Sequence, residues 1–393
     1  MFRSFYLLVT SQSLANLADV FLRLSLIADI YLVTHSVMAT TVIPVFIGLS
    51  AFIASFLVPL VTKKLPMNQV LSFTQLAKTL LLLLLIVSLN ICAYPIVIVI
   101  VYICTVGISI FDGFAQPVSS ALIPTYLTNL ARGNALFATI SEIVSVVGWS
   151  LGGVLYGYLH LIGSLWVIFA LYLLASILSF VLPTAQCEVI ENETSWQSVT
   201  KGWRFIFTNK TLSIVVGCNL FEILANSIWV SSIILVFVTQ ILHQDEHYWG
   251  YINTTYSLGI ILGGALIYRY AEKVSDKKGK SIVLALLFAA SMTLISLVSA
   301  NAWIFLICSV GIGFFSQLKE IPETVLLQSA VVENQLIHLY AALEVISTLS
   351  FSLFTLAMSS LAQYFGVRIV FMIAILSLVV EAWIYYRNQN LIN

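Results

Sequence analysis

Charged and amide side chains occur inside stretches of this sequence that are otherwise long and apolar enough to cross a lipid bilayer. Four of the residues of this kind in the stretch 5–33 are spaced four, three and four positions apart, which places them on one face of a helix. They are Gln12, Asn16, Asp19 and Arg23. A charge at the centre of a bilayer costs at least about 2.5–3.5 kcal/mol, so the stripe must face a water-filled cavity or a partner.

A second polar stripe occupies the stretch 210–240. Its members are Asn219, Glu222 and Asn226. Glu222 has no basic residue three or four positions away, so we predict a carboxyl group that takes up and releases a proton. Asp19 has such a neighbour in Arg23, and three roles stay open for it: a structural ion pair, proton or cation binding, and a conformational gate. The other polar members of both stripes are predicted to line a cavity for substrate.

Apolar stretches make up most of the chain. Of the 393 residues 60% are apolar and 9% are charged, against about 25% charged in soluble domains. Polar, proline and glycine clusters divide the sequence into stretches long enough to span the hydrocarbon core. The predicted fold class is an all-α polytopic membrane protein with twelve transmembrane helices. These helices are 5–33, 38–62, 69–91, 95–117, 133–158, 162–183, 210–240, 248–271, 280–299, 302–325, 335–361 and 366–386.

An even number of spans places both termini on one side of the membrane. Thirteen of the 17 Lys and Arg residues lie at span ends or in loops on that side, which the positive-inside rule makes cytoplasmic. The longest polar stretch, 185–209, is predicted to be a cytoplasmic loop with an amphipathic helix at the membrane surface. It separates an N-terminal six-helix bundle, 1–184, from a C-terminal bundle, 210–393.

The two halves are similar to one another in sequence. "GISIF" (107–111) is matched by "GIGFF" (311–315), and "IYLVT" (30–34) by "LVFVT" (235–239), at offsets of 204 and 205 residues. Two six-helix repeats of the same orientation, joined by a long cytoplasmic loop, resemble the major facilitator superfamily of transporters (the MFS fold). The resemblance implies that two bundles rock about a central site and open it to each side of the membrane in turn.

One branch of that superfamily is similar in its motifs. "FAQPVSSALIP" (114–124), "GNAL" (133–136) and "GWSLGG" (148–153) resemble the pattern of the macrolide-efflux and enterobactin exporters. In the superfamily the first, fourth, seventh and tenth spans line the cavity. The resemblance therefore implies that Asp19 and Glu222 face one cavity from opposite walls.

Other ionisable residues lie within the predicted spans. Glu142 and Glu344 hold equivalent places in the two halves. For them we predict either a proton relay or contacts with a neighbouring helix end or base. Lys78, which with Asp19 also resembles the exporter branch, is predicted to pair with an acid of its own bundle or to extend towards the interface.

Several charged residues are candidates for a gate or an ion pair near the cytoplasmic ends of the spans. Those within spans are Asp112, Lys319, Glu320 and Glu323. Lys319 and Glu323 are four residues apart, which is salt-bridge spacing on a helix. The loop after the second span reads "PLVTKKLPMNQ" (59–69), so Lys63 stands where the superfamily pattern has Asp. Lys63 and Lys64 are the gate candidates of this loop.

Small and aromatic residues within the spans are candidates for helix packing and for substrate contact. G-x-x-x-G spacing, which lets helices approach closely, occurs in spans five and eight. The glycines are Gly148, Gly152, Gly153, Gly157, Gly259 and Gly263. Because these spans meet between the halves in the superfamily, the resemblance implies a sliding contact there; packing within each half is the alternative. Trp149 and Trp229 are predicted to reach the cavity, where aromatic rings suit an amphipathic substrate.

The sequence holds no nucleotide-binding loop, nucleophile–base motif or metal-ligand pattern, so we predict no enzyme activity, catalytic residue, cofactor or metal. The net charge of zero gives no reason to expect nucleic acid as a partner. The resemblance implies proton-coupled efflux of amphipathic organic compounds, such as drugs or macrolides. We expect a monomer in a bacterial cytoplasmic membrane, whose partners are a small-molecule substrate, protons and lipid. A dedicated exporter of a siderophore, peptide antibiotic or lipid is the alternative; a membrane-embedded enzyme and a receptor that does not transport belong to other classes.

Overall fold

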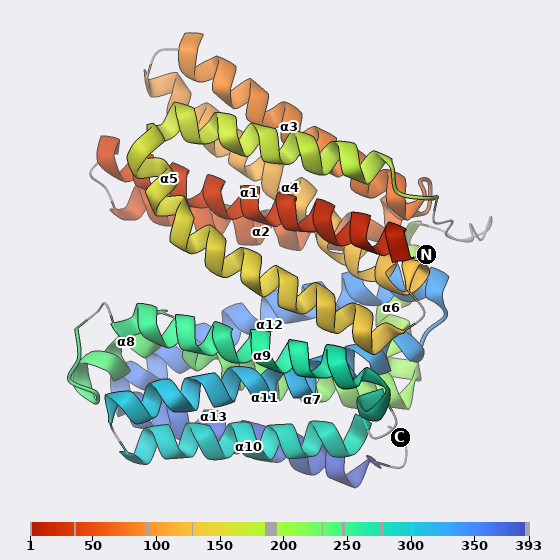
Figure 1. Ribbon diagram of the computed structural model, residues 1–393, viewed down its shortest axis with the longest axis vertical. Coiled ribbons are helices and arrows are strands. Elements are labelled where there is room, and N and C mark those ends of the chain that lie inside the picture. Colours follow the sequence, from red (N-terminus) through yellow and green to blue (C-terminus); the bar gives the residue numbers. More distant parts are fainter. Residues whose placement is uncertain are drawn as a thin grey trace. The chain divides into compact units, whose positions relative to one another are not determined.

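Every regular element of the described residues is helical in the computed structural model, as the sequence predicts (Figure 1). The structure describes residues 2–34, 37–91, 94–127, 129–184, 195–229, 231–245, 248–275, 278–299 and 301–389. The first half forms α1 (Phe2–Thr34), α2 (Val37–Thr62), α3 (Met67–Ile91), α4 (Tyr94–Tyr126) and α5 (Leu130–Phe180). The rest forms α6 (Ser195–Thr208), α7 (Lys210–Asn226), α8 (Ser231–Gln240), α9 (Tyr248–Ser275), α10 (Lys278–Ser299), α11 (Ala302–Ser329), α12 (Leu336–Phe365) and α13 (Val367–Arg387), with the short 3₁₀ helices η1 (Ser227–Trp229) and η2 (Glu333–Gln335).

The predicted break between the stretches 133–158 and 162–183 is present in the structure. Both stretches lie in α5, whose two helical parts meet at His160, where φ is 52° and ψ is −168°. Figure 1 shows α5 turning back on itself. The predicted span 210–240 is divided into α7, η1 and α8. At that division the Ser227 hydroxyl donates a hydrogen bond to the Leu224 carbonyl (2.7 Å), which competes with regular helix bonding.

The chain divides into two compact units. Unit 1 comprises residues 1–128, 143–203 and 333–345. Unit 2 comprises residues 129–142, 204–332 and 346–393. The first turns of α5 thus belong with the helices of the second half, and the start of α12 belongs with those of the first.

The composition of the helices suits a lipid environment. Among the described residues, eight helices are long and apolar enough to cross a membrane, judged by length and composition. Large apolar side chains such as Leu84, Ile103 and Leu353 are exposed. In a membrane protein these side chains face acyl chains, so their exposure carries no solvation penalty.

Each unit has a buried apolar core. In unit 1 the core gathers around Leu165, Ile168 and Tyr172 of the second half of α5. In unit 2 it is aromatic: the Phe237 ring stacks on Phe371, with 4.4 Å between centroids. These cores fix the helices that carry the charged residues described below.

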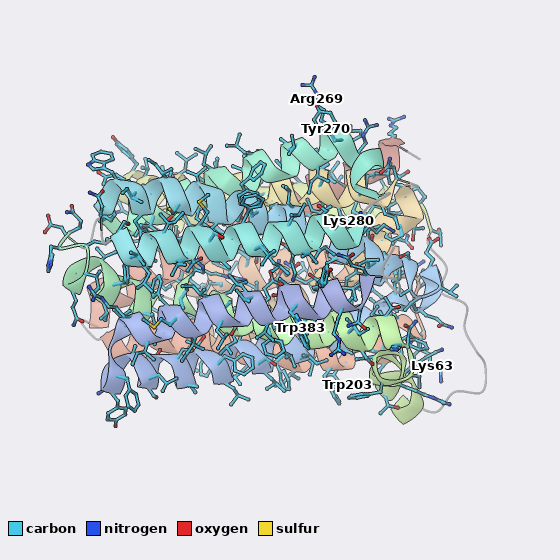
Figure 2. The ribbon with its side chains drawn as sticks, turned by 90° about the horizontal axis from the view of Figure 1, so that it is seen from below. Lys63, Trp203, Arg269, Tyr270, Lys280 and Trp383 are labelled. Carbon is cyan, nitrogen blue, oxygen red and sulfur yellow. The ribbon has the colours of Figure 1, made fainter. Side chains whose placement is uncertain are left out.

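Basic and aromatic side chains pair near the ends of two helices. The Arg269 guanidinium lies 5.8 Å from the Tyr270 ring centroid on α9, and Arg387 lies 5.1 Å from the Trp383 ring on α13. Figure 2 shows Arg269 and Tyr270 projecting outward. Such pairs are typical of the membrane–water interface. The cytoplasmic orientation of the termini stays a prediction.

The predicted surface helix of the central loop is α6. Residues 185–194 of that loop lie outside the described residues. In α6, Phe207 is exposed and Ile206 is buried, as expected of an amphipathic helix. A Cβ atom at Gly202 would lie 2.0 Å from the His338 carbonyl oxygen, so α6 packs tightly on the start of α12.

Some of the G-x-x-x-G glycines pack closely on helices of their own unit, and others face open space. Cβ atoms at Gly148 and Gly152 would meet Val20 and Leu24 of α1, at 3.0 and 2.4 Å. At Gly153 and Gly157 a Cβ atom would meet nothing within 4 Å. A Cβ atom at Gly263 would lie 2.6 Å from the Phe314 carbonyl of α11. The alternative of packing within each half is thus present at Gly148, Gly152 and Gly263, and the sliding contact between halves stays a prediction.

Spans five and eight do meet, but through other residues. The first turns of α5 contribute Ala135 and Thr139, and a Cβ atom at Gly264 of α9 would lie 2.1 Å from the Thr139 hydroxyl oxygen. Asn134, from the "GNAL" motif, and Gln328 of α11 exchange hydrogen bonds of 2.6 and 3.2 Å. All of these contacts lie within unit 2.

The tightest approach in the second half is between α9 and α11. A Cβ atom at Gly259 would lie 2.0 Å from the Val310 carbonyl oxygen, and one at Gly313 would lie 2.1 Å from that of Tyr256. We therefore expect Gly259→Ala to force the helices apart and to lower the free energy of unfolding by about 1–3 kcal/mol. Unfolding of the purified protein by SDS titration measures this.

The matched control for that variant is Gly153→Ala, because nothing lies within 4 Å of the added methyl group. Its free energy of unfolding should stay unchanged or rise by up to about 1 kcal/mol, since alanine favours the helix. Equal destabilisation by both substitutions would contradict the close approach of α9 and α11.

Candidate functional site

A buried lysine stands at the centre of the polar residues of unit 1. Lys78 lies on α3, and its side chain is 0% exposed. Its Nζ lies 2.7 Å from Asp19 Oδ2 of α1 and 3.0 Å from Asp112 Oδ1 of α4. The sequence predicts that Lys78 either pairs with an acid of its own bundle or extends towards the interface. In the structure it forms ion pairs with two acids of its own bundle.

Tyr172 closes this cluster from the second half of α5. Its hydroxyl donates to Asp19 Oδ1 at 2.5 Å, and the Lys78 ammonium lies 4.9 Å from its ring centroid. Both oxygens of the Asp19 carboxylate thus receive a donor. A buried carboxylate is stable under these conditions because its charge is paired and its lone pairs are used.

Arg23 brings a second positive charge to this group of Lys78, Asp19, Asp112 and Tyr172, which together with Arg23 forms the N-terminal cluster. Its guanidinium lies 3.7 Å from Asp112, and its side chain is 38% exposed. The predicted alternative of an Asp19–Arg23 pair along one helix is replaced by pairs with other helices, since Asp19 bonds Lys78. Two cations therefore face two carboxylates, and the cluster is electrically balanced.

A small pocket borders the N-terminal cluster. Asp19, Arg23 and Asp112 line it together with Thr105 and Ser109 of α4. Its free space is no larger than a water molecule. Gln12 is buried and Asn16 half-buried on α1, outside the lining of this pocket.

Unit 2 has a buried lysine of its own, Lys319 of α11. It forms ion pairs with Glu222 of α7 and with Glu323 one turn along α11, and its Nζ lies 3.1 Å from Glu381 Oε1 of α13. The predicted salt bridge between Lys319 and Glu323 is present. The absence of an in-helix base beside Glu222 did not leave it unpaired, because the lysine comes from another helix.

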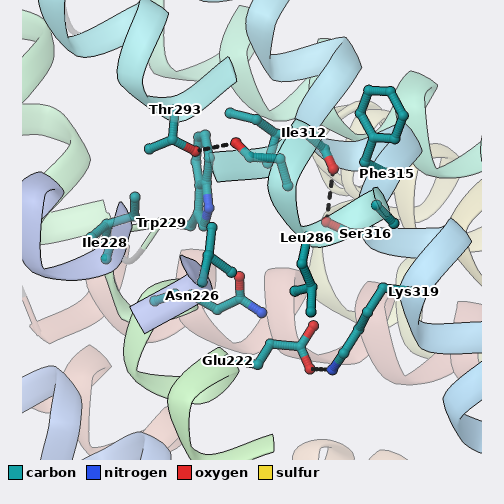
Figure 3. A pocket seen from close by; sticks show the side chains of 15 residues that line it. Glu222, Asn226, Ile228, Trp229, Leu286, Thr293, Ile312, Phe315, Ser316 and Lys319 are labelled. Carbon is teal, nitrogen blue, oxygen red and sulfur yellow. Dashed lines mark hydrogen bonds and ion pairs between the residues drawn. The ribbon is translucent and has the colours of Figure 1, made fainter. Parts of the chain in front are cut away.

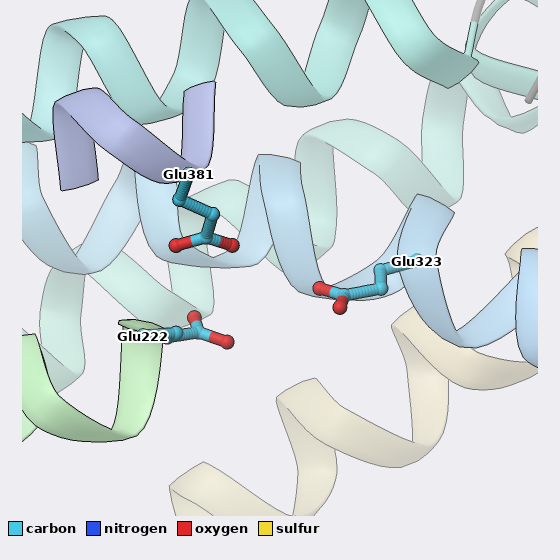
Figure 4. A group of neighbouring side chains, drawn as sticks. All are labelled: Glu222, Glu323 and Glu381. Atoms are coloured by element: carbon cyan, nitrogen blue, oxygen red, sulfur yellow. The ribbon is translucent and has the colours of Figure 1, made fainter. Parts of the chain in front are cut away.

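A tyrosine of the last helix closes this cluster too. The Tyr385 hydroxyl of α13 donates to Glu323 Oε1 at 2.9 Å. The carboxyl oxygens of Glu222, Glu323 and Glu381 lie within 4.8 Å of one another. Figure 4 shows the three side chains turned toward a common centre.

In each unit, one helix of the charged cluster has a proline about one turn after a charged residue: Pro322 follows Lys319, and Pro117 follows Asp112. Pro322 of α11 has no N–H for the Leu318 carbonyl, and the Ser281 hydroxyl of α10 donates to that oxygen at 3.4 Å. The freed carbonyl therefore gains a partner on a neighbouring helix.

The same arrangement of a proline and a serine from a neighbouring helix occurs in α4 of unit 1. Pro117 leaves the Gly113 carbonyl without its helical donor, and the Ser55 hydroxyl of α2 donates to it at 3.3 Å. Gly113 directly follows Asp112 of the charged cluster. Both charged clusters thus lie where a helix has lost one of its own hydrogen bonds.

A pocket inside unit 2 borders the second cluster. It is lined by Glu222, Asn226 and Trp229 from the seventh span and by Ser316 and Lys319 of α11 (Figure 3). It has room for a water molecule but not for an organic substrate in this conformation. Glu222 is the cluster member that meets the pocket and is 17% exposed.

The remaining predicted residues lie apart from the two clusters. Trp149 is exposed on α5, and Asn219 is half-buried on α7 outside the pocket lining. Glu320 is exposed and accepts a hydrogen bond of 2.8 Å from Gln317. Lys63 and Lys64 follow the end of α2, with Lys64 exposed.

The repeat-equivalent acids Glu142 and Glu344 are both half-buried. Glu142 belongs to unit 2 and Glu344 to unit 1, where its charge interacts with that of Asp112. A proton relay through them stays a prediction.

Sequence reasoning missed Glu381, Tyr172 and Tyr385. Glu381 carries a signal, since it is an acid inside an apolar predicted span, "LSLVVEAWIYY" (376–386). The two tyrosines carry none, because tyrosine is common in membrane helices and only the fold aims these hydroxyls at carboxylates.

Known proteins share this architecture. The crystal structure of a bacterial homologue of the iron transporter ferroportin matches with a TM-score of 0.74 at 11% identity, over 98% of each chain. The Escherichia coli fucose:proton symporter matches with a TM-score of 0.73 at 13% identity, again over 98% of each chain. The fold is that of the major facilitator superfamily.

Sequence comparison points the same way. The model of the Major Facilitator Superfamily matches residues 215–390. Two Bacillus subtilis (strain 168) proteins match almost end to end, both described as uncharacterized MFS-type transporters. YfmI is 28% identical over 99% of this chain and 97% of its own, and YjbB is 26% identical over 99% and 98%. The chain is thus similar over almost its whole length to proteins described as MFS-type transporters.

The major facilitator fold confirms the predicted all-α class with its two six-helix bundles. The macrolide-efflux and enterobactin-exporter branch stays a prediction, because the matched relatives carry no assigned substrate.

The balance of the N-terminal cluster can be tested by stability. Lys78→Met leaves Asp19 and Asp112 with only Arg23, so we expect the free energy of unfolding to fall by about 3–5 kcal/mol. The double variant Lys78→Met/Asp19→Asn restores one cation and one anion and should recover part of the loss. SDS titration measures both; an unchanged single variant, or a double variant less stable than the single one, would contradict the pairing.

Proposed function

We propose that this chain is a proton-coupled secondary transporter that exports amphipathic organic compounds across a bacterial cytoplasmic membrane. Transport follows alternating access, as in the superfamily whose fold the chain has. The exporter direction rests on the resemblance of residues 114–153 to the macrolide and enterobactin exporters.

The observation that carries the proposal is the Glu222–Lys319 ion pair at the edge of a pocket. Lys319 is buried, whereas Glu222 is partly exposed to a space that admits water. A carboxylate placed between a buried cation and water can exchange a proton with that water. Buried ionisable groups within membrane spans are the usual parts of proton relays in transporters.

The energetics suit exchange of a proton for a substrate. One proton that enters down a potential of about 100 mV supplies about 2.3 kcal/mol. This is sufficient for an uphill gradient of roughly 50-fold for a neutral substrate, since 1.4 kcal/mol corresponds to a factor of ten.

The substrate class rests on the aromatic lining of the pocket in unit 2. Trp229 lines this pocket beside Asn226, and its ring lies 5.3 Å from that of Tyr256. Aromatic surface next to a carboxylate suits an organic molecule with an apolar body and a polar or cationic group. In alternating access this region opens when the bundles move.

Proteoliposomes with a pH-sensitive dye in the lumen test the function. The probes are erythromycin, ethidium and enterobactin, each added to acid-loaded vesicles. We expect at least one probe to evoke proton release, and Glu222→Gln to reduce it by about tenfold or more, since a proton-transfer group contributes about 10²–10⁴ in rate.

The matched control is Asp245→Asn, which removes an exposed carboxylate outside the helices and should leave proton release unchanged. Response to a single probe favours a dedicated exporter, and response to several favours multidrug export. No proton movement with any probe, or full movement in Glu222→Gln, would contradict the proposal.

A further inference from the structure

The two charged clusters differ in their balance of charge. In unit 1, Lys78 and Arg23 face two carboxylates, Asp19 and Asp112. In unit 2, Lys319 is the one cation that faces three carboxyl groups among the residues that the structure describes. These are Glu222, Glu323 and Glu381. Together with Lys319 they form the C-terminal cluster. If all three carboxyl groups were ionised, this cluster would carry two uncompensated negative charges.

Burial makes that state untenable. The side chains of Lys319, Glu323 and Glu381 are 1%, 4% and 0% exposed, so water does not screen them. Carboxylates held within 4.8 Å of one another in such a place repel strongly, and like charges at this separation do not all ionise. Charge neutrality of the cluster requires two protons in addition to the lysine.

The hydrogen bonds indicate where these protons are. Glu323 receives donors from Lys319 and from the Tyr385 hydroxyl, which suits an ionised carboxylate. Glu381 is fully buried, and among the described residues its Oε2 has no hydrogen-bond partner. Figure 4 shows this carboxyl group directed into the cluster. A carboxylate oxygen without a donor is costly to bury, whereas a protonated one is neutral.

Glu222 is the remaining carboxyl group and the one that lines the pocket. Its proton can pass to a water molecule there, because the pocket has room for one. When the O–H bond of Glu222 breaks, the proton goes to that water and the carboxylate is held by the Lys319 ammonium.

We propose that the cluster of Glu222, Glu323 and Glu381 around Lys319 is the proton-binding site, with one proton kept on Glu381 and one exchanged at Glu222. This deepens the proposed function, on which it rests, by assigning its proton to one bundle. The balanced N-terminal cluster then serves to hold its helices together.

Other titratable groups near the site do not change this count. They are Cys218 of α7, Glu320 of α11 and Tyr385 of α13. The residues that α10 contributes to the pocket are Ala285, Leu286, Ala289 and Thr293, which carry no charge.

Infrared difference spectroscopy of the purified full-length protein in lipid tests the inference. A protonated carboxyl group absorbs in its own C=O stretching region and shifts in D₂O. We expect Glu381→Gln to lose one carboxyl equivalent of this band relative to wild type. Asp19→Asn is the matched control and should leave the band unchanged, because its carboxylate is ionised.

A second variant moves the band in the opposite direction. Lys319→Met removes the ammonium, so Glu323 must also take a proton and the band should gain one carboxyl equivalent. Glu381→Gln exchanges one neutral group for another of the same shape, so it should fold even where Lys319→Met does not, and it decides the question alone.

An unchanged band in Glu381→Gln, or a loss in Asp19→Asn, would overturn the inference. A band that appears only after sodium is removed would place that cation in the site and would also overturn it. The measurement needs neither substrate nor gradient. If the infrared result fails while proton flux stays intact, the proposed function stands without this site. If the infrared result is as expected but no probe moves protons, only the proposed function is contradicted.

Discussion

A buried ammonium group in each bundle is the constraint on which the rest of the structure depends. Lys78 and Lys319 have almost no exposed surface, and neither could remain charged in a membrane without carboxylates close by. Each lysine is therefore paired with acids, all of which except Glu323 come from other helices. Because a half-satisfied cluster costs more than an apolar core, these ion pairs fix which helices must pack together.

Around each lysine the two halves repeat one design with different residues. The first helix of the half supplies a carboxylate, Asp19 or Glu222, and the last supplies a tyrosine hydroxyl. A proline one turn away, Pro117 or Pro322, frees a carbonyl that a serine of a neighbouring helix satisfies. The two clusters differ in their number of acids and of cations, and that difference separates a balanced cluster from one that must bind protons.

The sequence predicts the class of fold and much of the site, for identifiable reasons. Apolar length and the repeat in sequence give the spans, and the cost of charge in lipid marks Asp19, Lys78, Glu222 and Lys319 as special. It does not give their partners, because pairs such as Lys78–Asp19 join helices 59 positions apart in sequence. The break of α5 at His160 lies between the predicted spans 133–158 and 162–183, where the sequence indicates a boundary.

Gradient-driven transport compared with substrate counterflow tests the central claim most directly. Counterflow needs the conformational cycle but no net proton movement, so it separates coupling from structure. With whichever of erythromycin, ethidium or enterobactin evokes proton release, Glu222→Gln should lose gradient-driven transport by about tenfold or more and keep counterflow, because the exchanged proton is assigned to Glu222 and only the coupling between proton and substrate is removed. Gradient-driven transport that persists at the wild-type level in Glu222→Gln would contradict the account.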